Sequence, residues 1–134
     1  MKKTKVKKIK KLTTRQLQDK LWIECRRLVD ILHKGQNGTY TCFTCGKPIS
    51  GSNKHLGHFI PSSTCGAYLR YDLRNLRWQC MNCNVWGGGQ GAVFYKNLVE
   101  IEGQQYVDIL FKEKNKIIKA YDYWLELLEK YKAK

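Results

Sequence analysis

The sequence predicts an α+β fold in which helices at both ends flank a middle part of short strands and tight turns. Near both ends, apolar residues recur every three or four positions, which is the periodicity of an amphipathic helix. The middle, residues 39–90, is rich in turn formers and cysteine. The chain has 134 residues, enough for one domain, and we expect residues 13–134 to form it.

The N-terminal helix is expected within residues 13–34. Thr13 and Gln16 have the spacing of a capping box, in which the side chain of each residue accepts a hydrogen bond from the backbone of the other. Gly35 ends the helix. The apolar face has spacings of three and four residues and consists of Leu17, Leu21, Cys25, Leu28 and Leu32.

In the middle part, residues 56–60 and 68–71 have the composition of short strands, and three glycines at 87–89 interrupt the chain. Trp78 and Trp86 lie close to a pair of cysteines in this part, and we expect both in its core.

The C-terminal part, residues 91–132, is expected to be helical. A helix over residues 92–102 would end at Gly103, and a second helical stretch over 104–132 would bend near Lys114. We expect the aromatic stripe of this stretch to pack against the N-terminal helix, although its spacing also suits a homodimer interface. The stripe consists of Ile117, Tyr121, Trp124, Leu128 and Tyr131.

The charge of the chain indicates a polyanionic partner, for which nucleic acid is the best fit. Lysine and arginine number 25 against 11 acids, giving a formal net charge of +14. Residues 1–12 alone contain seven lysines, and we expect a flexible arm that follows DNA phosphates. The phosphate contacts expected in this arm are Lys2, Lys3, Lys5, Lys7 and Lys8.

Two observations predict a cytoplasmic protein that does not interact with membranes. No stretch approaches the ~20 apolar residues of a membrane-spanning helix. The basic N-terminus is not followed by the uninterrupted apolar run of a secretory signal. In a reducing compartment, cysteines bind metals more often than they form disulfides.

Four of the six cysteines form two CxxC pairs, Cys42 with Cys45 and Cys80 with Cys83. Two intervening residues allow both sulfurs of a pair to reach one ion around a tight turn. Four thiolates suit tetrahedral Zn²⁺, and a closed set of four protein ligands is typical of a structural site. The sequence therefore predicts structural zinc in the middle part.

The segment that holds these pairs is poor in acids, because Asp72 is its only carboxylate between Asp30 and Glu100. If residues 55–60 form a strand, His55 faces one side and His58 the other. Asn84 directly follows the last cysteine. The zinc ion should therefore bring His58 and Asn84 close together.

The segments HLGHF, LRYDLRN and QCMNCN resemble the phage lambda Rap/NinG recombination endonucleases. More broadly, they resemble HNH (ββα-metal) nucleases, which are built on a treble-clef zinc scaffold. The resemblance covers residues 40–110. It implies a zinc-stabilised treble-clef core and cleavage of branched DNA, including Holliday junctions and D-loops.

The resemblance also implies roles for single residues. His58 matches the general base, and Asn75 matches the asparagine that braces the loop carrying that base. Asn84 matches a ligand of the catalytic divalent ion, and Cys42, Cys45, Cys80 and Cys83 match the structural zinc ligands.

This chain departs from the HNH pattern at Gly57, where such nucleases commonly carry a second ligand of the catalytic ion. We expect His55 to supply this ligand, with Asp72 as the alternative. Oxygen ligands favour Mg²⁺, and a histidine ligand shifts the preference towards Mn²⁺.

The function expected is a metal-dependent DNA endonuclease acting on branched recombination intermediates. The basic residues of the central segment, Lys54, Arg70, Arg74 and Arg77, are expected to contact DNA. Two alternatives remain open: a non-catalytic zinc module that binds DNA or RNA, and a sequence-specific HNH endonuclease. The length of the chain disfavours the second alternative, because it leaves little room for a separate DNA-reading domain.

Overall fold

The computed structural model describes residues 10–134, in which helices combine with two small sheets, as expected for an α+β fold. Within this range, no helix is both long enough and apolar enough to cross a membrane. The phosphate contacts predicted in the N-terminal arm lie outside the described residues: Lys2, Lys3, Lys5, Lys7 and Lys8.

Helix α1 (Thr14–Leu32) begins with the predicted capping box. The Gln16 backbone N–H donates to Thr13 Oγ1 (3.1 Å), and the Thr13 N–H donates to Gln16 Oε1 (2.8 Å). The predicted apolar face is buried as far as Leu28, but Leu32 is 58 % exposed because the helix ends there, and Val29 is buried instead.

Two antiparallel pairs of strands form the middle part: β1 (Tyr40–Thr41) with β2 (Pro48–Ile49), and β3 (His55–His58) with β4 (Leu76–Gln79). Strand β3 confirms the predicted strand over residues 56–60, displaced by one to two residues. In the β3–β4 pair, His55 lies opposite Gln79, and His58 lies opposite Leu76.

The strand predicted over residues 68–71 is wrong, because most of this segment lies in helix α2 (Gly66–Arg70). Four residues are too few for periodicity to separate the two conformations. Helix α2 places Leu69 in the core, where it is fully buried in a cluster with Phe94 and Leu110.

The C-terminal part contains α3 (Gly91–Glu102), α4 (Gln104–Glu113) and α5 (Tyr121–Lys132). Gly103 separates the first two helices at φ 94°, a left-handed conformation that favours glycine, so the predicted break is confirmed. The predicted bend near Lys114 is a complete break, since seven residues outside any helix separate α4 from α5.

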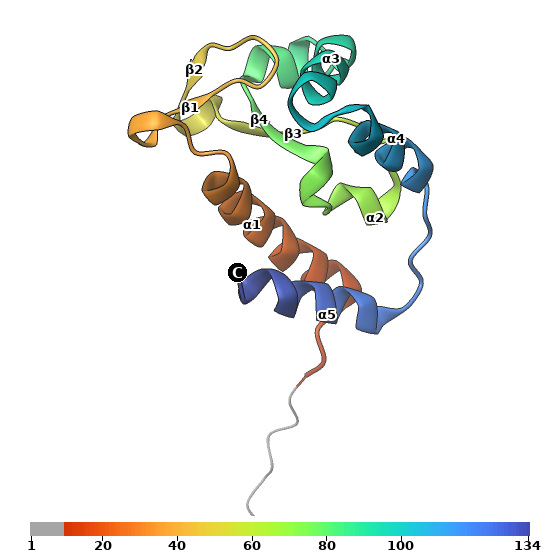
Figure 1. The fold of residues 1–134 in the computed structure, drawn as a ribbon. Coiled ribbons are helices and arrows are strands. Elements are labelled where there is room, and N and C mark those ends of the chain that lie inside the picture. Colours follow the sequence, from red (N-terminus) through yellow and green to blue (C-terminus); the bar gives the residue numbers. More distant parts are fainter. Residues whose placement is uncertain (1–9) are drawn as a thin grey trace, which may run out of the picture.

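Helix α5 packs along α1, as Figure 1 shows, and its aromatic stripe therefore faces the interior of the molecule. Trp124, Leu128 and Tyr131 are buried there, whereas Ile117 precedes the helix and is 76 % exposed. The predicted packing of the stripe on the N-terminal helix is thus confirmed, and a homodimer remains a prediction.

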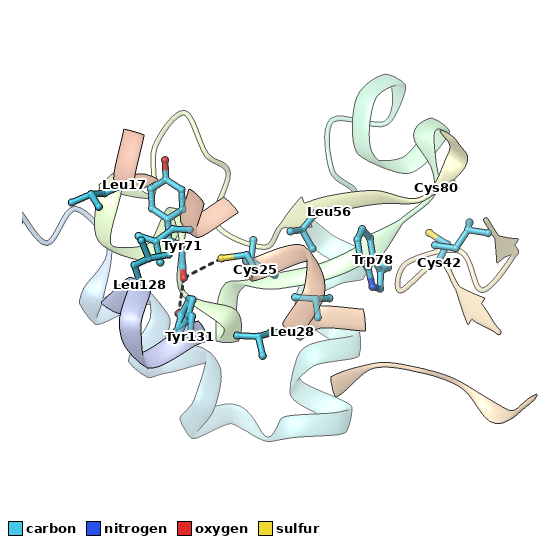
Figure 2. Packing of buried hydrophobic residues seen from close by; sticks show 14 of the residues in the cluster. Leu17, Cys25, Leu28, Cys42, Leu56, Tyr71, Trp78, Cys80, Leu128 and Tyr131 are labelled. Atoms are coloured by element: carbon cyan, nitrogen blue, oxygen red, sulfur yellow. Dashed lines mark hydrogen bonds between the residues drawn. The ribbon is translucent and has the colours of Figure 1, made fainter. Parts of the chain in front are cut away.

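The core that α1 and α5 share continues onto the β3–β4 sheet and includes three of the four CxxC cysteines, Cys42, Cys80 and Cys83. Figure 2 shows its centre, where the backbone carbonyl of Tyr71 accepts hydrogen bonds from Tyr131 Oη (2.7 Å) and Cys25 Sγ (3.6 Å). Trp78 lies in this core as predicted, but Trp86 is 78 % exposed, so its expected burial is wrong.

Candidate functional site

The four cysteines of the two CxxC pairs meet at one point between the sheets. Cys42 and Cys45 lie on the turn between β1 and β2, and Cys80 and Cys83 follow β4. Their sulfurs all lie within 4.8 Å of one another, and the Cys45 and Cys80 sulfurs are 3.7 Å apart. Four sulfurs bound to one zinc ion at about 2.3 Å stand roughly 3.8 Å apart at tetrahedral corners. The cluster could therefore hold a metal ion such as zinc.

Backbone groups point at the sulfurs in the same way in both pairs. The Cys45 N–H donates to Cys42 Sγ (3.5 Å), and the Cys83 N–H donates to Cys80 Sγ (3.4 Å). Burial raises the pKa of the Cys42 thiol, but hydrogen bonds from the Thr44 hydroxyl and from backbone N–H groups outweigh burial and lower it to about 6. A thiol that loses its proton near neutral pH suits a metal ligand.

His58 ends β3 and is held from two sides. Its ring stacks on Trp22 of α1, with centroids 5.4 Å apart and planes 9° from parallel. Its Nε2 lies 3.0 Å from the Arg70 carbonyl oxygen, which can only accept, so Nε2 carries the proton. In the neutral ring, Nδ1 then keeps its lone pair.

Burial also keeps the His58 ring neutral. It lowers the pKa of His58 below its ordinary value, although the hydrogen bond to the Arg70 carbonyl acts in the opposite direction. The site therefore contains a neutral imidazole of fixed tautomer at neutral pH.

Asn75 is fully buried and fixes the chain just beyond His58. Its Oδ1 accepts from the Ile60 N–H (2.8 Å), and its Nδ2 donates to the carbonyls of Ile60 (3.1 Å) and Leu69 (3.3 Å). Its own carbonyl accepts from the Phe59 N–H (2.9 Å). These four bonds hold Asn75 to Phe59, Ile60 and Leu69, so Asn75 fixes the two residues that follow His58.

Asn84 lies in a short turn of π-helix, Asn82–Trp86, that also carries Cys83, and its side chain meets His55. Asn84 Nδ2 and His55 Nδ1 are 3.3 Å apart, and His55 Nε2 is 3.1 Å from the Ser52 carbonyl. The carbonyl can only accept, so His55 Nε2 is the donor and Nδ1 accepts from Asn84. This leaves the amide oxygen of Asn84 as its atom available to a cation.

The structure brings Asn84 and His58 together, because both line one small cavity of about 130 Å³. Gly88 and Gly89 close its other side. On the far side of Asn84, a wider cavity of about 370 Å³ is lined by His55, Trp22 and other residues. His58, Asn84 and His55 therefore follow one another along the surface next to the cysteine cluster.

The presence of glycine at position 57 has a structural reason that the sequence does not reveal. A Cβ atom at this position would lie 1.9 Å from Gln79 Oε1, so the Gln79 side chain occupies the space that a side chain at 57 would need. Gln79 is fully buried, and its Nε2 donates to Thr44 Oγ1 (3.1 Å) and to the Gly89 carbonyl (2.9 Å). Gln79 thereby joins the first cysteine pair, β3 and the glycine loop of the small cavity.

Asp72, the alternative ligand, is placed elsewhere. Its carboxylate accepts from the backbone N–H (2.9 Å) and the guanidinium (2.6 Å) of Arg74, which also contacts Glu113. The cavity that Asp72 lines, among the described residues, includes neither His58 nor Asn84. Of the two candidates, only His55 reaches Asn84.

Of the four basic residues predicted to contact DNA in the central segment, two are engaged inside the protein and two line cavities near the site. Arg77 is 3 % exposed and donates to the Leu76 carbonyl (2.8 Å), so this arginine does not present itself to a phosphate. Arg74 is held in the ion pairs just described. Lys54 binds Asp30 (2.6 Å) but also lines the cavity of His55, and Arg70 lines a cavity beside His58.

The sequence did not indicate Trp22 or Gln79 as parts of the site. Trp22 is a large aromatic residue that lies outside the predicted apolar face of α1. This position outside the face is the one signal in the sequence that could have identified it. Gln79 directly precedes a metal-cluster cysteine, but only its pairing with β3 brings it to Gly57.

Comparison with known proteins adds one finding to this geometry. The model of the family described as bacteriophage lambda NinG protein matches residues 1–134. No curated protein and no solved structure gives a significant match. Since the family match spans the whole chain, this protein belongs to the bacteriophage lambda NinG family.

Proposed function

We propose that this protein is a metal-dependent DNA endonuclease of HNH type that hydrolyses phosphodiester bonds in branched recombination intermediates. The observation that carries the proposal is the shared cavity of His58 and Asn84 beside a four-cysteine cluster. Membership of the NinG family and the resemblance to Rap/NinG endonucleases support the choice of branched DNA.

In this proposal, His58 acts as the general base. Its Nδ1 accepts a proton from the attacking water, while the bond from Nε2 to the Arg70 carbonyl stabilises the imidazolium that forms. Asn75 and Trp22 contribute by holding the ring and the chain that carries it.

The amide oxygen of Asn84 is the protein atom proposed to hold a catalytic divalent ion, either Mg²⁺ or Mn²⁺. Such an ion supplies Lewis-acid stabilisation of the scissile phosphate and of the leaving oxygen. His55 either joins Asn84 as a ligand through Nδ1 or orients it through the bond described above. No carboxylate lies in this ligand set, so the site needs phosphate oxygens from DNA to bind the ion tightly.

The test is a cleavage panel with the zinc-loaded 134-residue chain. Duplex, nicked, D-loop and four-way DNA are incubated with Mg²⁺ or Mn²⁺, and His58→Ala and Asn84→Ala are compared with wild type. His33→Gln, which alters a histidine outside the site, is the matched control. His58→Ala should lose cleavage by on the order of 10²–10⁴-fold while keeping zinc content and DNA affinity.

Two results would contradict the proposal. If His58→Ala cleaves DNA as well as wild type does, His58 is not the general base. Intact DNA of every form under both metals, with binding retained, would favour a non-catalytic zinc module that binds nucleic acid.

A further inference from the structure

A second cavity, of about 660 Å³, opens beside His58 between α1 and the loop that follows β3. Helix α1 contributes Gln18, Asp19 and Trp22 to its wall, and the loop contributes Ser62 and Ser63. This volume lies within the range of small-molecule sites, roughly 300–1,000 Å³. His58 lines both this cavity and the small one that it shares with Asn84, so the two cavities meet at the proposed base.

One part of the wall is aromatic and rigid. Trp22 stacks on His58 and meets Tyr71 edge-on, with ring centroids 6.3 Å apart and planes at 81°. Tyr71 is 8 % exposed and belongs to the main core. The wall therefore offers a fixed apolar surface to a flat ring, with little loss of conformational entropy on binding.

The polar groups of the wall have opposite charges. The Arg70 guanidinium donates to the Ser62 carbonyl (3.1 Å), and this bond keeps the positive charge of Arg70 near the loop. The α1 side presents the carboxylate of Asp19, an exposed residue, and the amide of Gln18, one helical position away. A carboxylate repels a phosphate but accepts hydrogen bonds from the N–H groups on the edges of nucleobases.

These features fit a nucleobase better than a sugar-phosphate chain. We propose that the cavity binds one unpaired nucleotide adjacent to the phosphate at His58, with the base against Trp22 and its N–H edge towards Asp19. This inference rests on the proposed function and narrows its substrate to DNA with an unstacked nucleotide beside the cut. A paired base inside a duplex must leave the stack before it can enter such a cavity.

The test compares two DNA duplexes that differ only in one unpaired nucleotide. One carries a single 2-aminopurine bulge, and the other is fully paired; binding is measured without added divalent metal, so that no cleavage occurs. Wild type should bind the bulged duplex roughly tenfold more tightly, as expected for one base in contact with an aromatic wall. The 2-aminopurine fluorescence should change on binding.

Three variants test whether the preference for bulged DNA depends on the cavity. Ser63→Tyr places a large side chain in the cavity from an exposed loop, so it should abolish the preference while leaving fully paired DNA bound as in wild type. Asp19→Asn should weaken the preference for the 2-aminopurine bulge, because the amino group of this base donates a hydrogen bond that a carboxylate accepts more strongly than an amide oxygen. Asp108→Asn removes an exposed carboxylate of α4 and should change neither property.

Equal affinity of wild type for bulged and paired DNA would overturn the inference, as would a preference that Ser63→Tyr retains. Neither result touches the proposed nuclease activity, which the His58 variants test separately. If instead wild type cleaves no DNA but prefers bulges through Ser63, the proposed function fails and the nucleotide cavity stands.

Discussion

Substituting Gly57 tests the packing of the Gln79 side chain, which occupies the space that a side chain at position 57 would need. In Gly57→Ala, the added methyl carbon would lie 1.9 Å from Gln79 Oε1 and 2.8 Å from Gln79 Cδ. Gln79 is fully buried, and its Nε2 is held by Thr44 and by the Gly89 carbonyl. We expect a shift of the side chain that admits the methyl group to break one of these bonds.

The expected loss of stability follows from three effects. Overpacking a closed site costs about 1–3 kcal/mol. The broken hydrogen bond of Gln79 adds about 1 kcal/mol. The lower entropy of the unfolded chain with alanine returns about 0.4–1 kcal/mol. The free energy of unfolding of Gly57→Ala should therefore fall by about 1–3.5 kcal/mol.

The assay is urea unfolding of zinc-loaded protein, followed by circular dichroism for wild type, Gly57→Ala, Gln79→Ala and the double variant. Removing the Gln79 side chain makes room for the methyl group, so the double variant should be more stable than additivity predicts by about 2 kcal/mol. A Gly57→Ala protein within 0.5 kcal/mol of wild type, or additive effects in the double variant, would refute this reasoning.

Three further predictions concern the metal, the pH and the core. Chelation, or Cys80→Ser, should lower the melting temperature and the zinc content measured by mass spectrometry, because an ion held by the four cysteines would supply folding energy to a segment of short elements. An unchanged melting temperature would argue against a structural metal. Burial and, second, the charge of Arg77 lower the pKa of His33 to about 4. Between about pH 6.5 and that value, the unfolded state alone binds the proton, so stability should decrease as pH falls, by at most about 1.4 kcal/mol per pH unit, and His33→Gln should flatten this slope in urea unfolding. Tyr131→Phe removes the 2.7 Å bond to the Tyr71 carbonyl and should lower the free energy of unfolding by about 1 kcal/mol in the same assay, whereas no change would show that this bond is not stabilising.

The sequence predicted best the features that are encoded within a few neighbouring residues. The capping box at Thr13, the break at Gly103 and the two CxxC pairs all depend on spacings of three residues or fewer, or on one glycine. In each case, the local geometry allows few alternatives, so short patterns are sufficient.

Features formed between distant segments were predicted less well. Strand β4 is buried at every position, so it lacks the alternation that identifies a strand with one exposed face. Trp22 and Gln79 reach the site only through the packing of α1 and the pairing of β4. Their roles therefore depend on the tertiary structure rather than on the residues next to them.

The charges show the same difference between features set by neighbouring residues and features set by distant segments. The central segment contains one acid, which made Arg74 and Arg77 look free to bind DNA. Glu102 and Glu113, which pair with them, come from helices that begin or extend beyond that segment. Charges that are separate along the chain can thus neutralise each other in space, and only the fold reveals which cations remain for DNA.

The packing of α1 against α5 also has a consequence for folding during translation. Arg27 of α1 donates to the Tyr131 carbonyl, a partner 104 residues later. During translation, the part of the α1 apolar face that α5 covers must therefore stay open until α5 has been made. Truncation before residue 121 would leave this part open, although every residue of the proposed site would still be present, so a shortened nascent product should aggregate rather than retain partial activity.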